Sequence, residues 1–184
     1  MENNENTISI QQVNQNISDN SNILVETSWA GSATLKQALA VHQVVIIHFL
    51  RDLGCIYCRG LVDRLYKTAQ QKQNLPPLLF VHFDSVSNGQ AFFQEHFPNS
   101  LHIADTEQKL YQLFGIQKIT WASFLNFKMW LTGISFFLKG YFPKKQTDPS
   151  ILSGTFLLKE GSVIWKHLAR YPGDDTLFPS ITSR

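Results

Sequence analysis

Two cysteines carry the clearest chemical signal in the sequence. Cys55 and Cys58 are the only cysteines of the chain, and two residues separate them in the stretch RDLGCIYCRG, residues 51–60. A C-x-x-C pair of this kind can form a redox-active disulfide, supply half of a zinc site, or fill a core with two small apolar side chains. The surrounding sequence favours the first of these uses.

The position of the motif favours redox chemistry. It follows the apolar run QVVIIHFLR, residues 43–51, which predicts a strand buried on both faces, and it opens a segment with helical spacing. Free N–H groups at a helix start favour a thiolate, and Arg51 or Arg59 adds positive charge. We therefore expect Cys55 to be the nucleophile, Cys58 to be the resolving cysteine, and Arg51 to stabilise the thiolate or an oxyanion.

A metal site and a plain core are the competing interpretations. Zinc usually needs four ligands, and the chain has no second C-x-x-C. A c-type haem would need a histidine at the position of Arg59. His48 and His82 lie in expected strands and are interpreted as hydrogen-bonded structural residues, although His48 is the histidine nearest to Cys55 in sequence. The sequence thus predicts no metal and no cofactor. A zinc site would require convergence of histidines from this set: His42, His48, His82, His96, His102 and His167.

Alternating helical and strand-like segments predict an α/β protein. Its plan is a thioredoxin-like fold, in which a mixed central sheet is covered by helices on both faces and a helical aromatic insertion precedes the final β-hairpin. The hairpin is expected to turn at residues 159–161. Two helices are expected to begin at capping boxes, formed by Thr34 with Gln37 and by Ser87 with Gln90. Further helices are expected to begin at Ile56, to follow Asp105 as the cap, and to span residues 175–181.

Composition and charge set the remaining limits. Apolar residues make up 43% of the chain, enough for a core, and a net charge of +2 without a basic run argues against nucleic acid as a partner. Residues 1–21, rich in Asn and Gln, are expected to form a disordered tail, and residues 22–184 a single domain. The tail lacks the pattern of a secretory signal, so we expect a cytoplasmic protein.

The aromatic insertion, residues 121–142, needs its own interpretation. The apolar part of the insertion contains Lys128, Asn126 and Gly133, which argues against a membrane span. Three roles remain open: to shield the thiols, to bind an apolar substrate, or to complete the core. We favour the last, because aromatic side chains are mostly core residues. We do not expect the insertion to contact a membrane surface, although several lysines neighbour its aromatic side chains.

Several segments together resemble a known family. VVIIHFLRDLGCIYCRGLVDRL, FDSVSNGQAFFQEHFP, ADTEQKLYQLFGI and SGTFLLKEGSVIWKHL are similar to the peroxiredoxin-like branch of the alkyl hydroperoxide reductase and thiol-specific antioxidant family. The likeness covers residues 35–181. Two positions depart from typical peroxiredoxins, which carry Pro and Thr where this chain has His48 and Asp52. The chain also lacks the proline that thioredoxins place before the strand facing the motif, and Gly154 there leaves room for close backbone approach to the cysteines.

The resemblance implies a thiol-dependent antioxidant oxidoreductase. It would reduce peroxides or disulfides through the Cys55–Cys58 pair, and a thioredoxin- or glutathione-type donor would supply electrons. Arg51, with the distant Arg170, is the candidate for stabilising charge on the departing oxygen. Two alternatives stay open, a protein disulfide reductase without peroxidase activity and a noncatalytic interaction module on the same fold. The sequence leaves the oligomeric state open.

Overall fold

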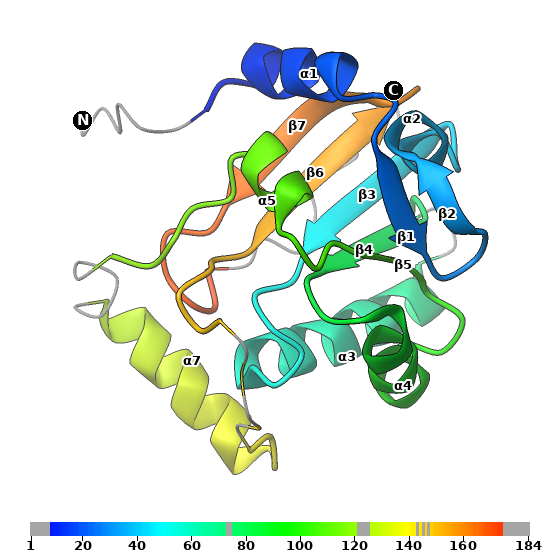
Figure 1. Cartoon of the computed structure of the whole chain (residues 1–184). Helices are drawn as coiled ribbons and strands as arrows, with labels where there is room; N and C mark the ends of the chain where they lie inside the picture. Colours follow the sequence, from blue (N-terminus) through cyan, green and yellow to red (C-terminus); the bar gives the residue numbers. More distant parts are fainter. Residues whose placement is uncertain are drawn as a thin grey trace.

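A seven-stranded sheet forms the centre of the molecule, with helices on both of its faces (Figure 1). The computed structural model describes residues 8–72, 75–120, 126–142, 144, 146 and 148–174. The strands are β1 Leu24–Thr27, β2 Gly31–Thr34, β3 Val44–Phe49, β4 Leu78–His82, β5 Leu101–Ala104, β6 Gly154–Lys159 and β7 Ser162–Leu168. The helices are α1 Ile10–Asp19, α2 Leu35–Leu39, α3 Ile56–Gln71, α4 Val86–His96, α5 Lys109–Leu113 and α7 Phe127–Leu138.

The sheet is mixed, and its parallel part carries the cysteine motif. The strand order is β2-β1-β5-β4-β3-β6-β7. Strands β3, β4 and β5 pair parallel with one another, whereas β6 pairs antiparallel with β3 and β7, and β1 pairs antiparallel with β5 and β2. The predicted mixed sheet is therefore confirmed. Strands β1 and β2 were not expected, because each is only four residues long.

Alternate residues of β3 face two separate cores. Val45, Ile47 and Phe49 pack on the side of α1 and α5, while Ile46 packs on the side of α3 and α4. All four side chains are buried. This strand is buried on both faces, as its unbroken apolar sequence predicts. The second core also contains both cysteines.

Helix α1 corrects the expectation of a disordered tail for residues 10–19. Val13 and Ile17 are buried against the first core, and the side-chain amide of Asn14 pairs with both backbone groups of Val163, at 2.7 and 3.0 Å. The polar composition hid this helix, because tertiary contacts with β7 rather than intrinsic propensity stabilise it. Residues 1–7 lie outside the described residues.

The expected turns and caps are mostly confirmed. Thr34 and Gln37 form the predicted capping box, and the hairpin between β6 and β7 turns at Glu160 and Gly161, both with positive φ. The cap of α4 is Ser85, not Ser87, since Ser85 Oγ accepts from the N–H of Asn88 at 3.2 Å. The helix expected at residues 175–181 lies outside the described residues.

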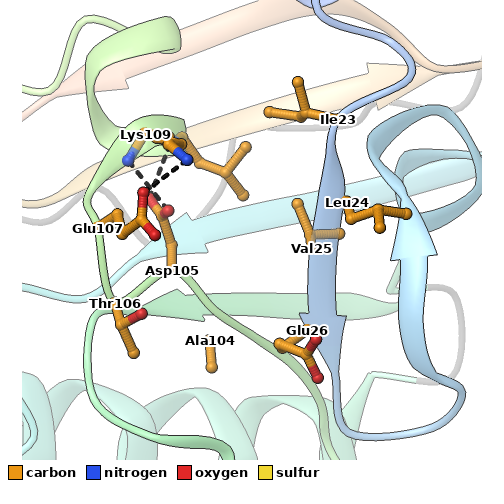
Figure 2. A pocket seen from close by; sticks show the side chains of 10 residues that line it. Ile23, Leu24, Val25, Glu26, Ala104, Asp105, Thr106, Glu107 and Lys109 are labelled. Carbon is orange, nitrogen blue, oxygen red and sulfur yellow. Dashed lines mark hydrogen bonds and ion pairs between the residues drawn. The ribbon is translucent and has the colours of Figure 1, made fainter.

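Asp105 holds the start of α5. Its carboxylate accepts from the backbone N–H group of Lys109 at 3.0 Å (Figure 2) and from those of Leu110 and Tyr111 at 2.7 and 3.2 Å. Asp105 thus caps the first N–H groups of α5 as expected, but the helix begins only at Lys109, and Gln108, with a positive φ, occupies its N-cap position. Figure 2 also shows that this carboxylate borders a shallow pocket between β1 and the segment that follows β5.

Candidate active site

Cys55 lies at the N-terminal cap of α3, immediately after the loop that leaves β3. Asp52 shapes this loop: its Oδ1 accepts from the N–H of Gly54 at 2.7 Å, and its carbonyl accepts from the N–H of Cys55 at 3.1 Å. The carbonyl of Cys55 then accepts from the N–H of Arg59, which begins the helix. The thiol therefore lies where helix N–H groups have no intrahelical acceptor.

Arg51 donates hydrogen bonds to both sulfur atoms. Its Nη1 donates to Sγ of Cys55 at 3.1 Å, and its backbone N–H donates to Sγ of Cys58 at 3.3 Å. The guanidinium is buried, and its other nitrogens donate to the carbonyls of Ile151 and Pro149, each at 2.9 Å. These carbonyls are neutral, so a thiolate on Cys55 would supply the negative charge that a buried cation requires.

The surroundings of the two thiols separate their pKa values. The pKa of Cys55 is lowered to about 7 by the hydrogen bond from Cys58, by the positive charge of Arg51, and by the backbone N–H groups of Cys58 and Tyr57, while burial acts in the opposite direction. Burial raises the pKa of Cys58, and the hydrogen bond to Cys55 and its charge raise it further. The lower pKa therefore belongs to the cysteine at the start of α3.

Both cysteines are buried. The exposed fraction is 1% for Cys55 and 3% for Cys58, and both are free thiols. Direct attack on a peroxide or a disulfide requires contact between the substrate and Sγ. Such an attack would therefore require a local opening of the surrounding loops.

The two positions that differ from typical peroxiredoxins have defined contacts. Asp52 is buried; besides Gly54, its carboxylate accepts from the N–H of Asp148 at 3.4 Å. His48 is also buried, and its Nδ1 lies 2.8 Å from Oγ1 of Thr155 on the neighbouring strand β6. This contact agrees with the interpretation of His48 as a hydrogen-bonded strand residue.

Four other histidines have partners of their own. His82 Nε2 lies 2.9 Å from His102 Nδ1, and His96 Nδ1 lies 2.9 Å from a carboxylate oxygen of Asp63. His167 Nε2 lies 2.7 Å from the carbonyl of Asp174. Across the part of the chain that the structure describes, no three His, Cys, Asp or Glu side chains gather as metal ligands would.

A pocket next to the motif is lined by Asp52 and by Asp84, which the sequence analysis did not single out. Asp52 follows β3 and Asp84 follows the neighbouring parallel strand β4, so both lie at the same edge of the sheet. The pKa of Asp84 is raised by burial and by the charge of Asp52, against the effect of a hydrogen bond from Asn88. The pair could have been inferred from the sequence, because each aspartate follows a predicted strand and the carboxyl ends of adjacent parallel strands lie at the same edge of a sheet. Other residues that line the pocket are Leu53, Gly54, Phe92, Glu95 and Lys144.

Two residues considered in the sequence lie elsewhere. Arg170 pairs with Asp174, with 3.0 Å between Nε and Oδ2, and its side chain is largely exposed. A Cβ at Gly154 would lie 2.5 Å from Cδ1 of Ile116. The backbone at Gly154 therefore lies close to the side chain of Ile116. The expectation that this glycine allows close approach to the cysteines is wrong.

Helix α7 covers the N-terminal half of α3 with one of its faces (Figure 1). Tyr57, between the two cysteines, donates its hydroxyl proton to the carbonyl of Met129 at 3.0 Å. A Cβ at Gly133 would lie 2.6 Å from this hydroxyl, and one at Gly60 would lie 2.2 Å from the ring of Phe136. Glycines on both helices therefore allow the close contact. Only Met129 and Phe136 of α7 are buried, so the expectation that the insertion completes the core is wrong for α7. Residues 121–125 lie outside the described residues.

Comparison with known proteins supports the resemblance. The profile of the AhpC/TSA antioxidant enzyme family matches residues 62–171, more than half of the chain. The match begins after both cysteines, so the assignment of Cys55 and Cys58 rests on the geometry described above. No curated protein sequence matches the chain.

Solved structures with low sequence identity share the fold. Peroxiredoxin Q of Xanthomonas campestris is 19% identical, with a TM-score of 0.51 and 82% of each chain covered. Peroxidoxin BcpB of Mycobacterium tuberculosis is 12% identical, with a TM-score of 0.55, 83% of this chain and 84% of that chain covered. A thiol peroxidase of Chromobacterium violaceum is 12% identical, with a TM-score of 0.54, 82% of this chain and 74% of that chain covered. These likenesses confirm the thioredoxin-like peroxiredoxin fold. The chain belongs to the AhpC/TSA antioxidant enzyme family, as a peroxiredoxin-like thiol oxidoreductase.

Proposed function

We propose that Cys55 is the attacking thiolate and Cys58 the resolving thiol of a peroxide-reducing cycle in the cytoplasm. The observation that carries this proposal is that Arg51 donates to both sulfur atoms, from its side chain to Cys55 at 3.1 Å and from its backbone N–H to Cys58 at 3.3 Å. The lowered pKa of Cys55 and the raised pKa of Cys58 support the same division of roles.

The first step oxidises Cys55. Its thiolate sulfur attacks the terminal oxygen of a hydroperoxide, ROOH, so that the S–O bond forms while the O–O bond breaks. The products are a sulfenic acid on Cys55 and an alkoxide, which takes a proton and leaves as the alcohol ROH. Arg51 supports this step because its guanidinium can stabilise the thiolate and the negative charge that develops on the departing oxygen.

The second step forms a disulfide. The sulfur of Cys58 attacks Sγ of Cys55, so that the S–S bond forms and the S–O bond breaks. The hydroxide that departs combines with the proton of Cys58 to give water. A thiol donor of the thioredoxin or glutathione type then returns two electrons and two protons. The raised pKa of Cys58 keeps its proton in place until this step.

Mass spectrometry of the intact protein after peroxide treatment tests the cycle. The wild-type chain should lose two hydrogen atoms as the disulfide forms. Cys58→Ser should instead gain one oxygen on Cys55, and Cys55→Ser should remain unchanged. Persistence of two free thiols in the wild-type chain would contradict the proposal.

A protein disulfide reductase is the second candidate. It is favoured by Asp52, whose carboxylate already accepts from Gly54 and Asp148 at a position where typical peroxiredoxins carry Thr. In this reaction Cys55 attacks a substrate disulfide, and Cys58 releases the reduced substrate. Hydroperoxide consumption and reduction of a protein disulfide, assayed on the same preparation, separate the candidates. A peroxidase consumes hydroperoxide, whereas a disulfide reductase without peroxidase activity reduces only the protein disulfide.

A further inference from the structure

Helix α7 has an exposed apolar face on the side opposite to α3. Met129 and Phe136 face α3, whereas the residues on the opposite side are at least half exposed. They follow one another at three- and four-residue steps, which places them on one helix face. These residues, called the outer face below, are Phe127, Trp130, Leu131, Ile134, Phe137 and Leu138. Figure 1 shows α7, in yellow, at the edge of the molecule beside α3.

The outer face continues beyond the helix. The ring of Phe142 contacts that of Phe137 edge to face, with 5.1 Å between their centroids, and Phe142 is itself 57% exposed. Its carbonyl accepts from Nη1 of Arg59 at 2.9 Å, which holds this segment close to the motif helix. A contiguous exposed apolar surface of this kind marks an interaction site.

The segment that carries this surface is basic. Residues 126–147 include four lysines and no Asp or Glu, although the net charge of the whole chain is only +2. Lys128 on α7 and Lys139 at its C-cap are both exposed, and they are eleven residues apart and therefore on the same side of the helix. The surface thus suits an anionic partner.

Acidic groups from the neighbouring helices offset only part of this charge, through Glu95 and Lys144. Glu95 of α4 lies 3.8 Å from Arg59 and 3.9 Å from Lys144, and Asp63 of α3 contacts His96 and Tyr141. Both acidic side chains therefore have partners on the side of α7 that faces the domain. The outer face itself carries neither Asp nor Glu.

We propose that the outer face of α7 docks on an anionic lipid bilayer, with the helix lying in the plane of the interface. Trp, Phe and Leu on one side and lysines beside them are the features of helices that bind in this way. The twelve residues of α7 span about 18 Å, too short to cross a hydrocarbon core of about 30 Å. Among the described residues no helix is long and apolar enough to cross a membrane.

A second copy of the chain is a poorer occupant for this surface. A symmetric dimer through α7 would bring two lysine-rich segments together, and like charges at an interface oppose association. Docking on a bilayer instead pairs these lysines with lipid phosphates. It also holds Tyr57 and the adjoining thiols close to the membrane, because α7 packs directly on the first turns of α3.

Flotation of the full chain with lipid vesicles tests the proposal. The chain should float with vesicles of phosphatidylcholine mixed with phosphatidylglycerol, and much less with phosphatidylcholine alone. Binding should weaken as salt increases, because exposed charges are screened. Failure to bind anionic vesicles at low salt would overturn the proposal, and so would a dimer that Ile134→Ser converts to a monomer without any vesicle binding.

Three variants locate the binding surface. Trp130→Ser combined with Ile134→Ser should weaken vesicle binding by about tenfold or more, and Lys128→Gln combined with Lys139→Gln should do the same for anionic vesicles. Ile164→Ser is the matched control, since Ile164 on β7 is 52% exposed, close to the 55% of Ile134, and should bind like the wild type. Equal loss in the control and in the outer-face variants would contradict the proposal.

The test is independent of the thiol chemistry. Cys55→Ser should still bind anionic vesicles, because Cys55 is buried and is not part of the outer face. The outer-face variants should in turn keep the wild-type rate of reaction with hydrogen peroxide in solution. Failure of docking and failure of the redox cycle therefore give different results.

Discussion

Nη1 of Arg51 lies 3.1 Å from Sγ of Cys55, and both groups are buried. Removing this charge in Arg51→Met should raise the pKa of Cys55 by about one unit, because a nearby opposite charge favours the ionised form. About fivefold less thiolate would then be present at pH 7, with a similar loss of peroxide reactivity. The pH dependence of alkylation measures the pKa. Arg170→Met, which removes an exposed arginine, should leave the pKa of Cys55 unchanged.

The hydrogen bond from Cys58 is the largest contribution that lowers the pKa of Cys55. Cys58→Ala removes this donor, whereas Cys58→Ser keeps a hydroxyl that can donate. We therefore expect the pKa of Cys55 to be higher in Cys58→Ala than in Cys58→Ser. Thiolate absorbance followed over a pH titration measures both values. Equal values in the two variants would show that the hydrogen bond does not set the pKa.

Asp105 accepts three backbone N–H groups at the start of α5. Asp105→Ala leaves these groups without their acceptor and should lower the free energy of unfolding by about 1–2 kcal/mol. Denaturant unfolding measures this loss. Glu107→Ala is the control, because the ion pair between Glu107 and Lys109 is exposed and should contribute little. A similar loss in both variants would argue against a specific capping role.

The sequence indicated where the cysteine motif lies in the fold better than it indicated the contacts of the motif. The position of Cys55 follows from a buried apolar run next to a helical segment, and both patterns are local. The contacts of Arg51 with Pro149 and Ile151 join residues about one hundred positions apart, and no local pattern indicates them. Asp84 was missed for the same reason, since its proximity to Asp52 depends on the pairing of β3 with β4.

Two helices were misjudged for opposite reasons. α1 is polar in sequence, yet Val13 and Ile17 are buried because β7 and α5 lie beside them. α7 is apolar in sequence, yet most of its large side chains are exposed, because α3 is its main packing partner among the described elements. Composition predicts burial only where another element is available to pack against, and that depends on tertiary structure.

The buried pair His82 and His102 should make the protein sensitive to acid. Burial lowers the pKa of His82 to about 3, with the charge of His102 adding to the effect, and burial lowers the pKa of His102 to about 4. The ordinary value is 6.5. Above that pH both histidines are neutral in the folded and unfolded states, and they contribute no pH dependence. Below it the unfolded chain binds protons that the folded chain does not, so stability falls as pH decreases towards 4.

We expect the free energy of unfolding to fall by roughly 1–3 kcal/mol per histidine between pH 6.5 and pH 4. His82→Leu removes one of the two groups and should make this dependence shallower, whatever its effect on stability at neutral pH. Denaturant unfolding of both proteins at several pH values measures the two slopes. The slope, rather than the absolute stability, tests the claim, because a packing defect at residue 82 would lower stability equally at each pH. Identical slopes in the two proteins would show that His82 is not the source of the acid sensitivity.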